Sequence, residues 1–452
     1  MNKDTPYPGL RHRLRTPGLR AGGPPTGPLA LPLFTGLLTG LLTGLLAGCS
    51  GSPGNDAGGV SVGAPGGPTP STNARFCPPA LLQSATTPLL VPTATSAEPA
   101  PGLPPAVRAD LARLGDLDVA TCVAVVTPQG ELLGLPLTPR RPSGAVEHVA
   151  VRRARLLEDN LDAVAAMLSA QAATAPGLDV VGAVRTAIRL HPTPTTMVVI
   201  SSGVATADPV DLRRVGWDPD AVATARAAAA LGWLPDLRGW RIRFAGLGDV
   251  ADGLPALPPP LQQRLVALWL AVGRTAGATS CTSDGGLPTR TAARSTNTVP
   301  PVPRPQLTSP VVAARPGGTS TTWRLPASLL FAVDSADLAA GTDPDLLRLV
   351  RIAQSSGGTV TVVGHTDAVT GTAAYNDALS LARARAVAER LQQLGLAPHR
   401  IAGVTGRGSR DASAAAETAD PALVGTDRNV VVTVTAHGGP PPQALPDPAN
   451  PA

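Results

Sequence analysis

The pattern of apolar and polar residues divides the middle of the chain, residues 106–278, into short apolar runs and longer periodic stretches. Short apolar runs predict strands, and apolar residues spaced three or four apart predict amphipathic helices. The predicted strands span 119–126, 196–201 and 240–245, and the predicted helices span 145–171, 178–190, 218–231 and 260–276. Strands that alternate with helices predict a doubly wound, mainly parallel α/β domain.

A second patterned stretch occupies residues 325–436. Its predicted strands span 328–333, 359–364, 401–406 and 429–435, and its predicted helices span 343–354 and 377–394. This order predicts a separate α/β sandwich domain with helices on one face of a mixed sheet. The loop 407–426 is long and polar, and we assign no site to it.

The segments outside these two domains are rich in glycine and proline. The chain contains 48 Gly and 50 Pro, more than one compact globule accommodates. We therefore expect a tether at 49–105, a disordered linker at 279–324 and a disordered tail at 437–452. The PPVPRP core of the linker favours a polyproline II spacer that would reach on the order of 100 Å.

The first 48 residues have the form of an export signal. Arginines precede an apolar run over 28–47, which ends in Leu46-Ala47-Gly48-Cys49. This resembles a lipoprotein signal peptide, which implies that the Cys49 thiol becomes diacylglyceryl-modified and that cleavage leaves Cys49 first in the chain. A transmembrane anchor is the alternative, because the run approaches the ~20 residues that a span needs. Either reading places the rest of the chain in the cell envelope, outside the cytoplasm.

The charge distribution argues against nucleic acid as a partner. The formal net charge is +5, but five basic residues and one acidic residue lie within the first 48. The rest of the chain has 32 basic and 31 acidic residues. It therefore offers no general excess of positive charge for binding phosphates.

Three cysteines remain after Cys49, which allows one disulfide and one thiol in an oxidising compartment. Cys77 and Cys281 flank the middle domain, so we expect a bridge that clasps its two ends. Cys122 lies within a predicted strand, where a reduced thiol packs well. A Cys122–Cys281 bridge remains an alternative. No C-x-x-C motif or Cys/His cluster occurs, so neither a metal nor another cofactor is expected.

The most informative motif follows the strand predicted at 359–364. Gly364-His365-Thr366-Asp367 ends this strand, and the next helix carries the pattern N-x-x-L-S-x-x-R-A from Asn376 to Ala384. A carboxylate at a strand end and an arginine early in the following helix can meet in one cleft. Asp367 suits an ammonium group and Arg383 suits a carboxylate, so the pair suits a zwitterion.

This motif resembles the OmpA-like C-terminal domain, and the resemblance covers about 325–436. It implies non-covalent binding of peptidoglycan through the diamino acid, of the diaminopimelate type, in the stem peptide. Asp367, Arg383 and Arg428 are then the binding residues. The sequence departs from the family pattern at two places: 368–375 is one residue longer than usual, which indicates an insertion, and Asn429 replaces the second arginine of the family's N-R-R-V strand start.

Three further residues of the motif read as structural support for the site. Asn376 is predicted to be the N-cap of its helix, because its side chain can accept backbone hydrogen bonds there. Ser380 is predicted to bond to nearby backbone. Leu379 shares the helical spacing of the predicted core face.

The middle domain carries a weaker resemblance. Ser201-Ser202-Gly203-Val204-Ala205-Thr206 follows an apolar strand and resembles the S-D-G-x-x-T turn of von Willebrand factor type A domains. The type A metal site also needs a D-x-S-x-S run after its first strand, but the strand 119–126 ends in Thr127-Pro128-Gln129-Gly130. We therefore expect a degenerate site that binds no divalent metal.

These features favour a non-catalytic lipoprotein that anchors a membrane to peptidoglycan. The alternative is an assembly or signalling adaptor, whose middle domain binds another envelope protein while the C-terminal domain only localises it. An enzyme is not expected: His365, Thr366 and Asp367 resemble a triad only in composition. Neighbours on an extended strand point to opposite faces, so Thr366 would face away from the other two. The sequence does not distinguish a plasma membrane from an outer one.

Overall fold

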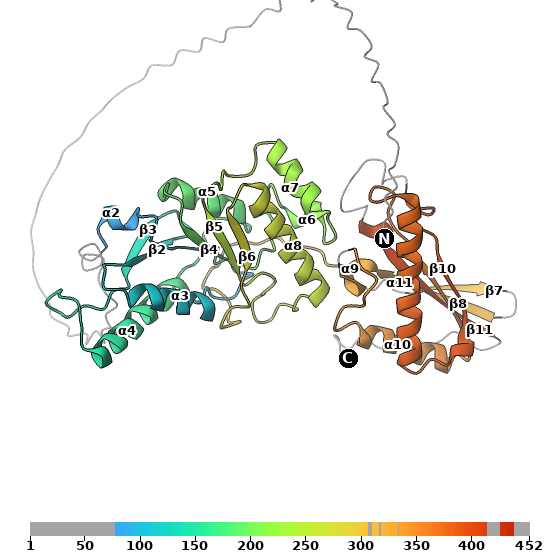
Figure 1. The fold of residues 1–452 in the computed structure, drawn as a ribbon. Coiled ribbons are helices and arrows are strands. Elements are labelled where there is room, and N and C mark those ends of the chain that lie inside the picture. The colour runs from blue at the N-terminus through green and yellow to red at the C-terminus, as the bar shows by residue number, and fades with distance from the viewer. Residues whose placement is uncertain (1–76, 306–309, 316–317, 333, 414–424, 438–452) are drawn as a thin grey trace, which may run out of the picture. The chain divides into compact units, whose positions relative to one another are not determined.

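The computed structural model describes residues 77–305, 310–315, 318–332, 334–413 and 425–437 (Figure 1). The predicted signal peptide, Cys49, the first part of the tether and nearly all of the predicted tail lie outside these residues. Two sheets organise the described chain. We call residues 77–305 the middle region and residues 310–437 the C-terminal region. Among the described helices, none combines the length and apolar character needed to cross a membrane.

The sheet of the middle region has the strand order β3-β2-β1-β4-β5-β6. Its strands are β1 (Leu89–Pro92), β2 (Cys122–Val126), β3 (Leu132–Pro136), β4 (Thr196–Ile200), β5 (Arg241–Ala245) and β6 (Ser280–Ser283). Neighbouring strands are parallel except β2 and β3, which form an antiparallel pair. This is the order of a doubly wound sheet, in which ligands bind at carboxyl strand ends where the winding reverses.

Helices cover both faces of this sheet (Figure 1). They are α2 (Pro79–Leu82), α3 (Pro105–Gly115), α4 (Ala150–Ser169), α5 (Val180–Leu190), α6 (Leu212–Val215), α7 (Ala221–Ala230) and α8 (Pro259–Thr275). Successive strand residues point to opposite faces. Leu89 and Val91 pack with α5 and α8, while Leu90 packs with α3 and α4. The predicted doubly wound architecture is confirmed.

The central strand β1 lies where the sequence predicts a tether, so that prediction is wrong for residues from 77 onward. All residues of β1 are buried. A strand of four residues that ends in proline has no alternation to detect, because both of its faces are covered. The strand predicted at 119–126 was therefore expected to be the first, but it corresponds to β2, the second strand of the described chain.

The C-terminal region contains a five-stranded mixed sheet in the order β10-β9-β11-β8-β7. Its strands are β7 (Val311–Arg315), β8 (Gly318–Pro326), β9 (Thr359–Gly364), β10 (Ile401–Gly406) and β11 (Asn429–His437). Its helices are α9 (Ala327–Leu330), α10 (Asp343–Ser355), α11 (Ala373–Gln393) and the 3₁₀ turn η1 (Pro398–Arg400). β9 pairs in parallel with β10 and in antiparallel with β11.

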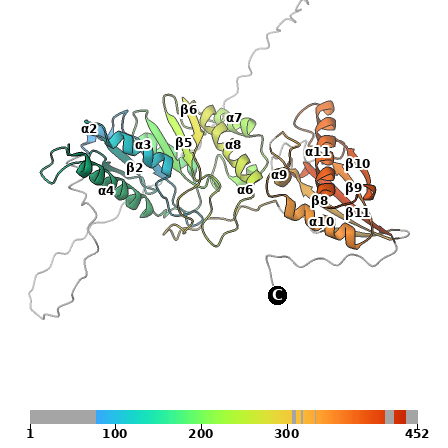
Figure 2. The same ribbon diagram turned by 60° about the horizontal axis from the view of Figure 1, so that its bottom comes forward.

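Helices α10 and α11 lie on one face of this sheet (Figure 2). Val360 and Val362 of β9 point to that face and meet Leu349 of α10 and Val387 of α11 in one core. This arrangement confirms the predicted sandwich. One predicted strand is wrong: most of 328–333 is the short helix α9 and the residues after it, and the strand before it is β8.

The predicted disordered linker at 279–324 is also wrong for its described residues. It contains β6, β7 and most of β8. Its proline-rich part packs onto the core of the middle region through Val299 and Val302. The Trp217 indole also donates to the Pro303 carbonyl at 2.7 Å. A polyproline segment has no internal hydrogen bonds, so its carbonyls are free to accept such contacts.

The disulfide joins Cys77 to Cys122, with the two Cα atoms 6.0 Å apart. The predicted Cys77–Cys281 bridge is therefore wrong, and Cys281 is a buried thiol. Burial raises the pKa of this thiol to about 11. The prediction failed because Cys122 opens β2 beside the segment that leads into β1, whereas Cys281 lies on β6 at the far edge of the same sheet.

Candidate functional site

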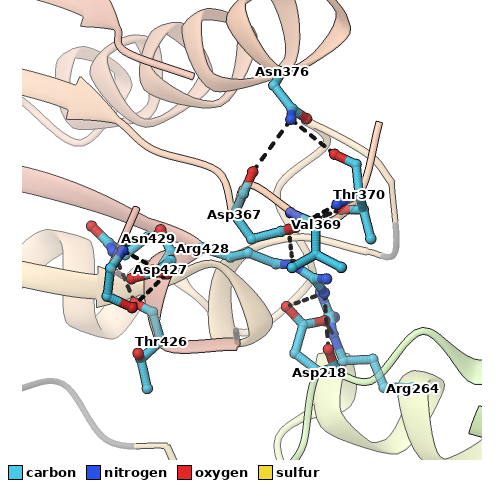
Figure 3. A network of polar contacts seen from close by, with 11 residues as sticks. Asp218, Arg264, Asp367, Val369, Thr370, Asn376, Thr426, Asp427, Arg428 and Asn429 are labelled. Carbon is cyan, nitrogen blue, oxygen red and sulfur yellow. Dashed lines mark hydrogen bonds and ion pairs between the residues drawn. The ribbon is translucent and has the colours of Figure 1, made fainter. Parts of the chain in front are cut away.

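Asp367 stands in the loop that leaves β9, and its carboxylate organises that loop. Its Oδ1 accepts hydrogen bonds from the backbone N–H groups of Val369 and Thr370, at 2.8 and 2.7 Å. The Thr370 hydroxyl donates to both carboxylate oxygens, at 3.0 and 2.9 Å. The Asp367 residue is only 1% exposed. Donors from the segment of the predicted insertion thus fix the orientation of this carboxylate (Figure 3).

Arg428, immediately before β11, supplies the positive charge next to Asp367. Its Nε donates to Asp367 Oδ2 at 2.5 Å. Burial by itself raises the pKa of Asp367, but the charge of Arg428 and the hydrogen bonds from Arg428 and Thr370 outweigh burial and hold the pKa below its ordinary value. Asp367 is therefore an anion at neutral pH.

Asn376 and Ser380 both support the site, although Asn376 does so differently from its predicted role. Helix α11 starts earlier than expected because Thr372 is its N-cap and accepts from the Tyr375 N–H. Asn376 lies inside the helix, and its Nδ2 donates to the carbonyls of Asp367 and Thr370 at 3.3 and 2.8 Å. Ser380 bonds to the Asp377 carbonyl, as predicted, and also accepts from the Gly408 N–H.

Arg383 projects from α11 and is 4% exposed. Its Nε donates to the Ser335 carbonyl at 2.9 Å, and its guanidinium carbon lies 5.4 Å from the centre of the Phe331 ring. Within the described residues, no carboxylate forms an ion pair with it. Burial is the main cause that lowers its pKa; Arg264 and Arg428 lower it further, against the opposing charges of Asp218 and Asp334. An arginine keeps its proton in a protein, so this is a buried cation with room for an anion.

A cavity of about 880 Å³, which we call the cleft, is lined by residues of the C-terminal region and of the middle region. Asp367, Arg383 and Arg428 all line it, so the structure brings together the three residues predicted to bind ligand. Leu379 also lines the cleft and is only partly buried; its predicted place in the core is wrong. It stands one turn before Arg383 on α11.

The sequence analysis missed Thr366 as a candidate contact. Thr366 lines the cleft and is 3% exposed, and its hydroxyl has no hydrogen-bond partner among the described residues. His365 instead turns toward Asp411, with Nδ1 3.2 Å from Oδ2. Burial lowers the pKa of His365. Thr366 and Asp367 therefore share the cleft while His365 does not, so the expectation that Thr366 faces away from Asp367 is wrong.

Asn429, where the family has a second arginine, has a structural role. Its Nδ2 donates to the carbonyls of Thr426 and Asp427, both at 3.0 Å, and so holds the turn that precedes β11 (Figure 3). Asn429 is not among the residues that line the cleft. The replacement therefore changes the support of Arg428 without placing another side chain in the cleft.

A second polar cluster lies in the middle region, at the carboxyl ends of β1 and β4. Glu98, 2% exposed, accepts hydrogen bonds from the Thr93 and Ser201 hydroxyls, each at 2.8 Å. The backbone N–H groups of Thr95 and Ser202 also donate to it, at 2.9 and 2.7 Å. The loop that faces Ser201 therefore follows β1, and the comparison with Thr127–Gly130 in the sequence analysis used the wrong strand. Among the described residues, no group of three or more His, Cys, Asp or Glu side chains is arranged around a metal-sized position.

Residues 330–422 match the OmpA family, which confirms the resemblance seen in the motif around Asp367. The cell wall anchor of the T6SS from Pseudomonas aeruginosa is similar at 29% identity, over 28% of this chain and 88% of that chain, with a TM-score of 0.23. The OmpA-like domain of FopA1 from Francisella tularensis is similar at 26% identity, over 28% and 80% of the two chains, with a TM-score of 0.23. The periplasmic domain of Helicobacter pylori MotB is similar at 20% identity, over 29% and 83%, with a TM-score of 0.23. No curated protein matches the chain.

Proposed function

We propose that this protein is a non-catalytic component of the cell envelope whose C-terminal region binds peptidoglycan without covalent chemistry. The OmpA family match over 330–422 supports the ligand class. The cleft supports the chemistry, because its lining includes both an ionised carboxylate, Asp367, and a buried cation, Arg383. The ligand group is the zwitterionic end of a stem-peptide diamino acid.

The observation that carries the proposal is that Arg383 is a buried cation without a carboxylate partner among the described residues. A buried cation that lacks a carboxylate partner is unfavourable unless an anion joins it. A ligand carboxylate would form a forked contact with the guanidinium, and the ligand ammonium would face Asp367. Arg428 keeps Asp367 ionised and oriented. The partly buried Leu379 also lines the cleft, as does Thr366, whose hydroxyl has no hydrogen-bond partner among the described residues.

The experiment is sedimentation of the full-length protein with insoluble peptidoglycan, with and without free diaminopimelate as competitor. Arg383→Ala should weaken binding at least tenfold, because truncating one partner of a buried charged contact costs ~2–5 kcal/mol. Arg383→Lys should recover only part of the loss, since an ammonium cannot form the forked contact. Arg385→Ala is the matched control: Arg385 lies on the same helix but is exposed. Equal sedimentation of the Arg383→Ala and Arg385→Ala variants would exclude this site.

We further propose that the N-terminal part of the chain anchors it to a membrane through lipidated Cys49, which makes the protein a link between membrane and wall. The support is the Leu46-Ala47-Gly48-Cys49 sequence at the end of an apolar run. Mass spectrometry of the mature protein provides the test. The expected first residue is a diacylglyceryl-modified Cys49, and a retained segment 29–47 with an unmodified thiol contradicts the anchor.

A further inference from the structure

The cleft receives side chains from the middle region as well as from the C-terminal region. Asp218, in the loop before α7, lies with its Oδ2 3.3 Å from Nη1 of Arg428, and its backbone carbonyl accepts from the same nitrogen at 2.9 Å (Figure 3). Arg264 of α8 donates from Nε to Asp218 Oδ1 at 2.7 Å and from Nη1 to the Phe331 carbonyl at 2.7 Å. Asp218 and Arg264 thus bond to residues of the C-terminal region, and both line the cleft themselves.

These contacts engage Arg428 from two sides. Its Nε is directed at Asp367 and its Nη1 at Asp218, so two carboxylates of the chain itself surround its guanidinium. The Asp218 side chain is 9% exposed and the Arg428 side chain 14%, which leaves little room for a third carboxylate, from a ligand, at this arginine. A carboxylate is also the group that Arg383, on the same lining, would accept from a ligand. Asp218 therefore places negative charge where a ligand carboxylate would meet repulsion.

We propose that the middle region holds the cleft closed, with Asp218 acting as an internal carboxylate that the ligand must displace from Arg428. This inference rests on the proposed function, because it concerns the regulation of the same cleft. When the binding-competent form is only part of the population, the apparent affinity falls in proportion to that part. Any partner that pulls the loop before α7 away from Arg428 then increases binding to the wall.

The decisive variant is Asp218→Asn in the full-length protein. It removes the negative charge but keeps an oxygen that Arg264 can bond to, so that Arg264 is not left buried without an acceptor. Binding to insoluble peptidoglycan should become tighter by about threefold or more, as the closed population falls. Asp236→Asn is the matched control, since Asp236 pairs with Arg238 on the surface of the same region and does not line the cleft. Thermal unfolding of both variants establishes that they are folded.

Three results separate this inference from the proposed function. Weaker binding by Asp218→Asn means that Asp218 contacts the ligand, and unchanged binding means that Asp218 does not restrain the cleft. Either result overturns the inference. The proposed function still stands if peptidoglycan binding is lost in Arg383→Ala. If no form of the protein binds peptidoglycan through Arg383, the proposed function fails instead. Hydrogen exchange then still tests the closure itself: the backbone before β11 should exchange faster in Asp218→Asn than in Asp236→Asn, and equal exchange overturns the closure.

Discussion

Each of the two sheets carries a buried carboxylate at the ends of its strands, Glu98 in the middle region and Asp367 in the C-terminal region. Polar groups near Asp367 lack partners among the described residues, whereas those bonded to Glu98 do not. In the middle region, Glu98 receives donors from Thr93, Thr95, Ser201 and Ser202, and none of the described residues forms an ion pair with it. In the C-terminal region, Asp367 is equally well bonded, yet Arg383 lacks a carboxylate partner among the described residues and the Thr366 hydroxyl lacks any partner there.

This difference separates a cluster with only a structural role from one that we propose binds a ligand. Buried polar groups in proteins are almost always satisfied, so each exception needs an explanation. The Glu98 cluster joins the loops after β1 and β4 at the point where a doubly wound sheet usually binds ligands, and it fills that point with the protein's own carboxylate. The cleft beside Asp367 instead contains a cation without a carboxylate partner and a hydroxyl without a hydrogen-bond partner among the described residues.

The largest effect that tests this contrast should come from Glu98→Ala. The substitution leaves three hydroxyls, of Thr93, Thr95 and Ser201, and two backbone N–H groups without their shared acceptor. Each unsatisfied buried group costs ~1–3 kcal/mol. We expect the free energy of unfolding to fall by about 3 kcal/mol or more, measured by urea unfolding followed by tryptophan fluorescence. Glu158→Ala is the control, because Glu158 makes only an exposed ion pair with Arg108. A change below about 1 kcal/mol in Glu98→Ala would mean that this cluster is not a structural joint.

A smaller effect should come from Arg383→Met, which we expect to weaken binding without reducing stability. Replacing a buried charged side chain by an apolar one of similar volume is often neutral or stabilising. Urea unfolding should therefore show no loss of stability, while sedimentation with peptidoglycan falls as it does for Arg383→Ala. A clear loss of stability in Arg383→Met would mean that Arg383, like Glu98, mainly stabilises the fold.

The smallest effect should come from Thr366→Val, which removes the hydroxyl and keeps the shape of the side chain. Stability should be unchanged, because the hydroxyl has no partner to lose among the described residues. Binding to peptidoglycan should weaken by about threefold to tenfold, the equivalent of one hydrogen bond of ~0.5–1.5 kcal/mol. Ser380→Ala is an informative comparison, since the Ser380 hydroxyl is already bonded to Asp377 and Gly408; its expected defect is in stability. Binding equal to wild type in Thr366→Val would remove this hydroxyl from the ligand contacts.

Much of the fold was predictable because local patterns carry it. The helices α4, α5, α7 and α8 and the strands β2, β4 and β5 lie within a few residues of their predicted positions. The strand β1 was not predictable from alternation, since a strand covered on both faces has no polar side. Proline-rich stretches were taken for linkers because composition does not reveal that carbonyls such as that of Pro303 have a buried donor to accept from.

The site was predictable to a similar degree. Asp367 and Arg383 belong to one continuous motif, so their meeting in one cleft follows from a strand, a loop and a helix in sequence. The start of α11 was not predictable, because Thr372 and Asn376 both carry side chains that can cap a helix. The contact of Asn376 with the loop after β9 decides between them. Asp218 could not be found at all, because it lies 210 residues from Arg428 along the chain.

The sequence by itself therefore determined the alternation of strands and helices in both regions, the family of residues 330–422 and the charged pair of the cleft. These properties depend on residues close together in the chain, where spacing sets which side chains share a face. Only the tertiary structure decided which cysteine joins Cys77, which strand is central, and that Asp218 stands against Arg428. Each of these depends on segments brought together by the burial of apolar surface, a non-directional force that leaves little trace in the spacing of the residues that finally meet.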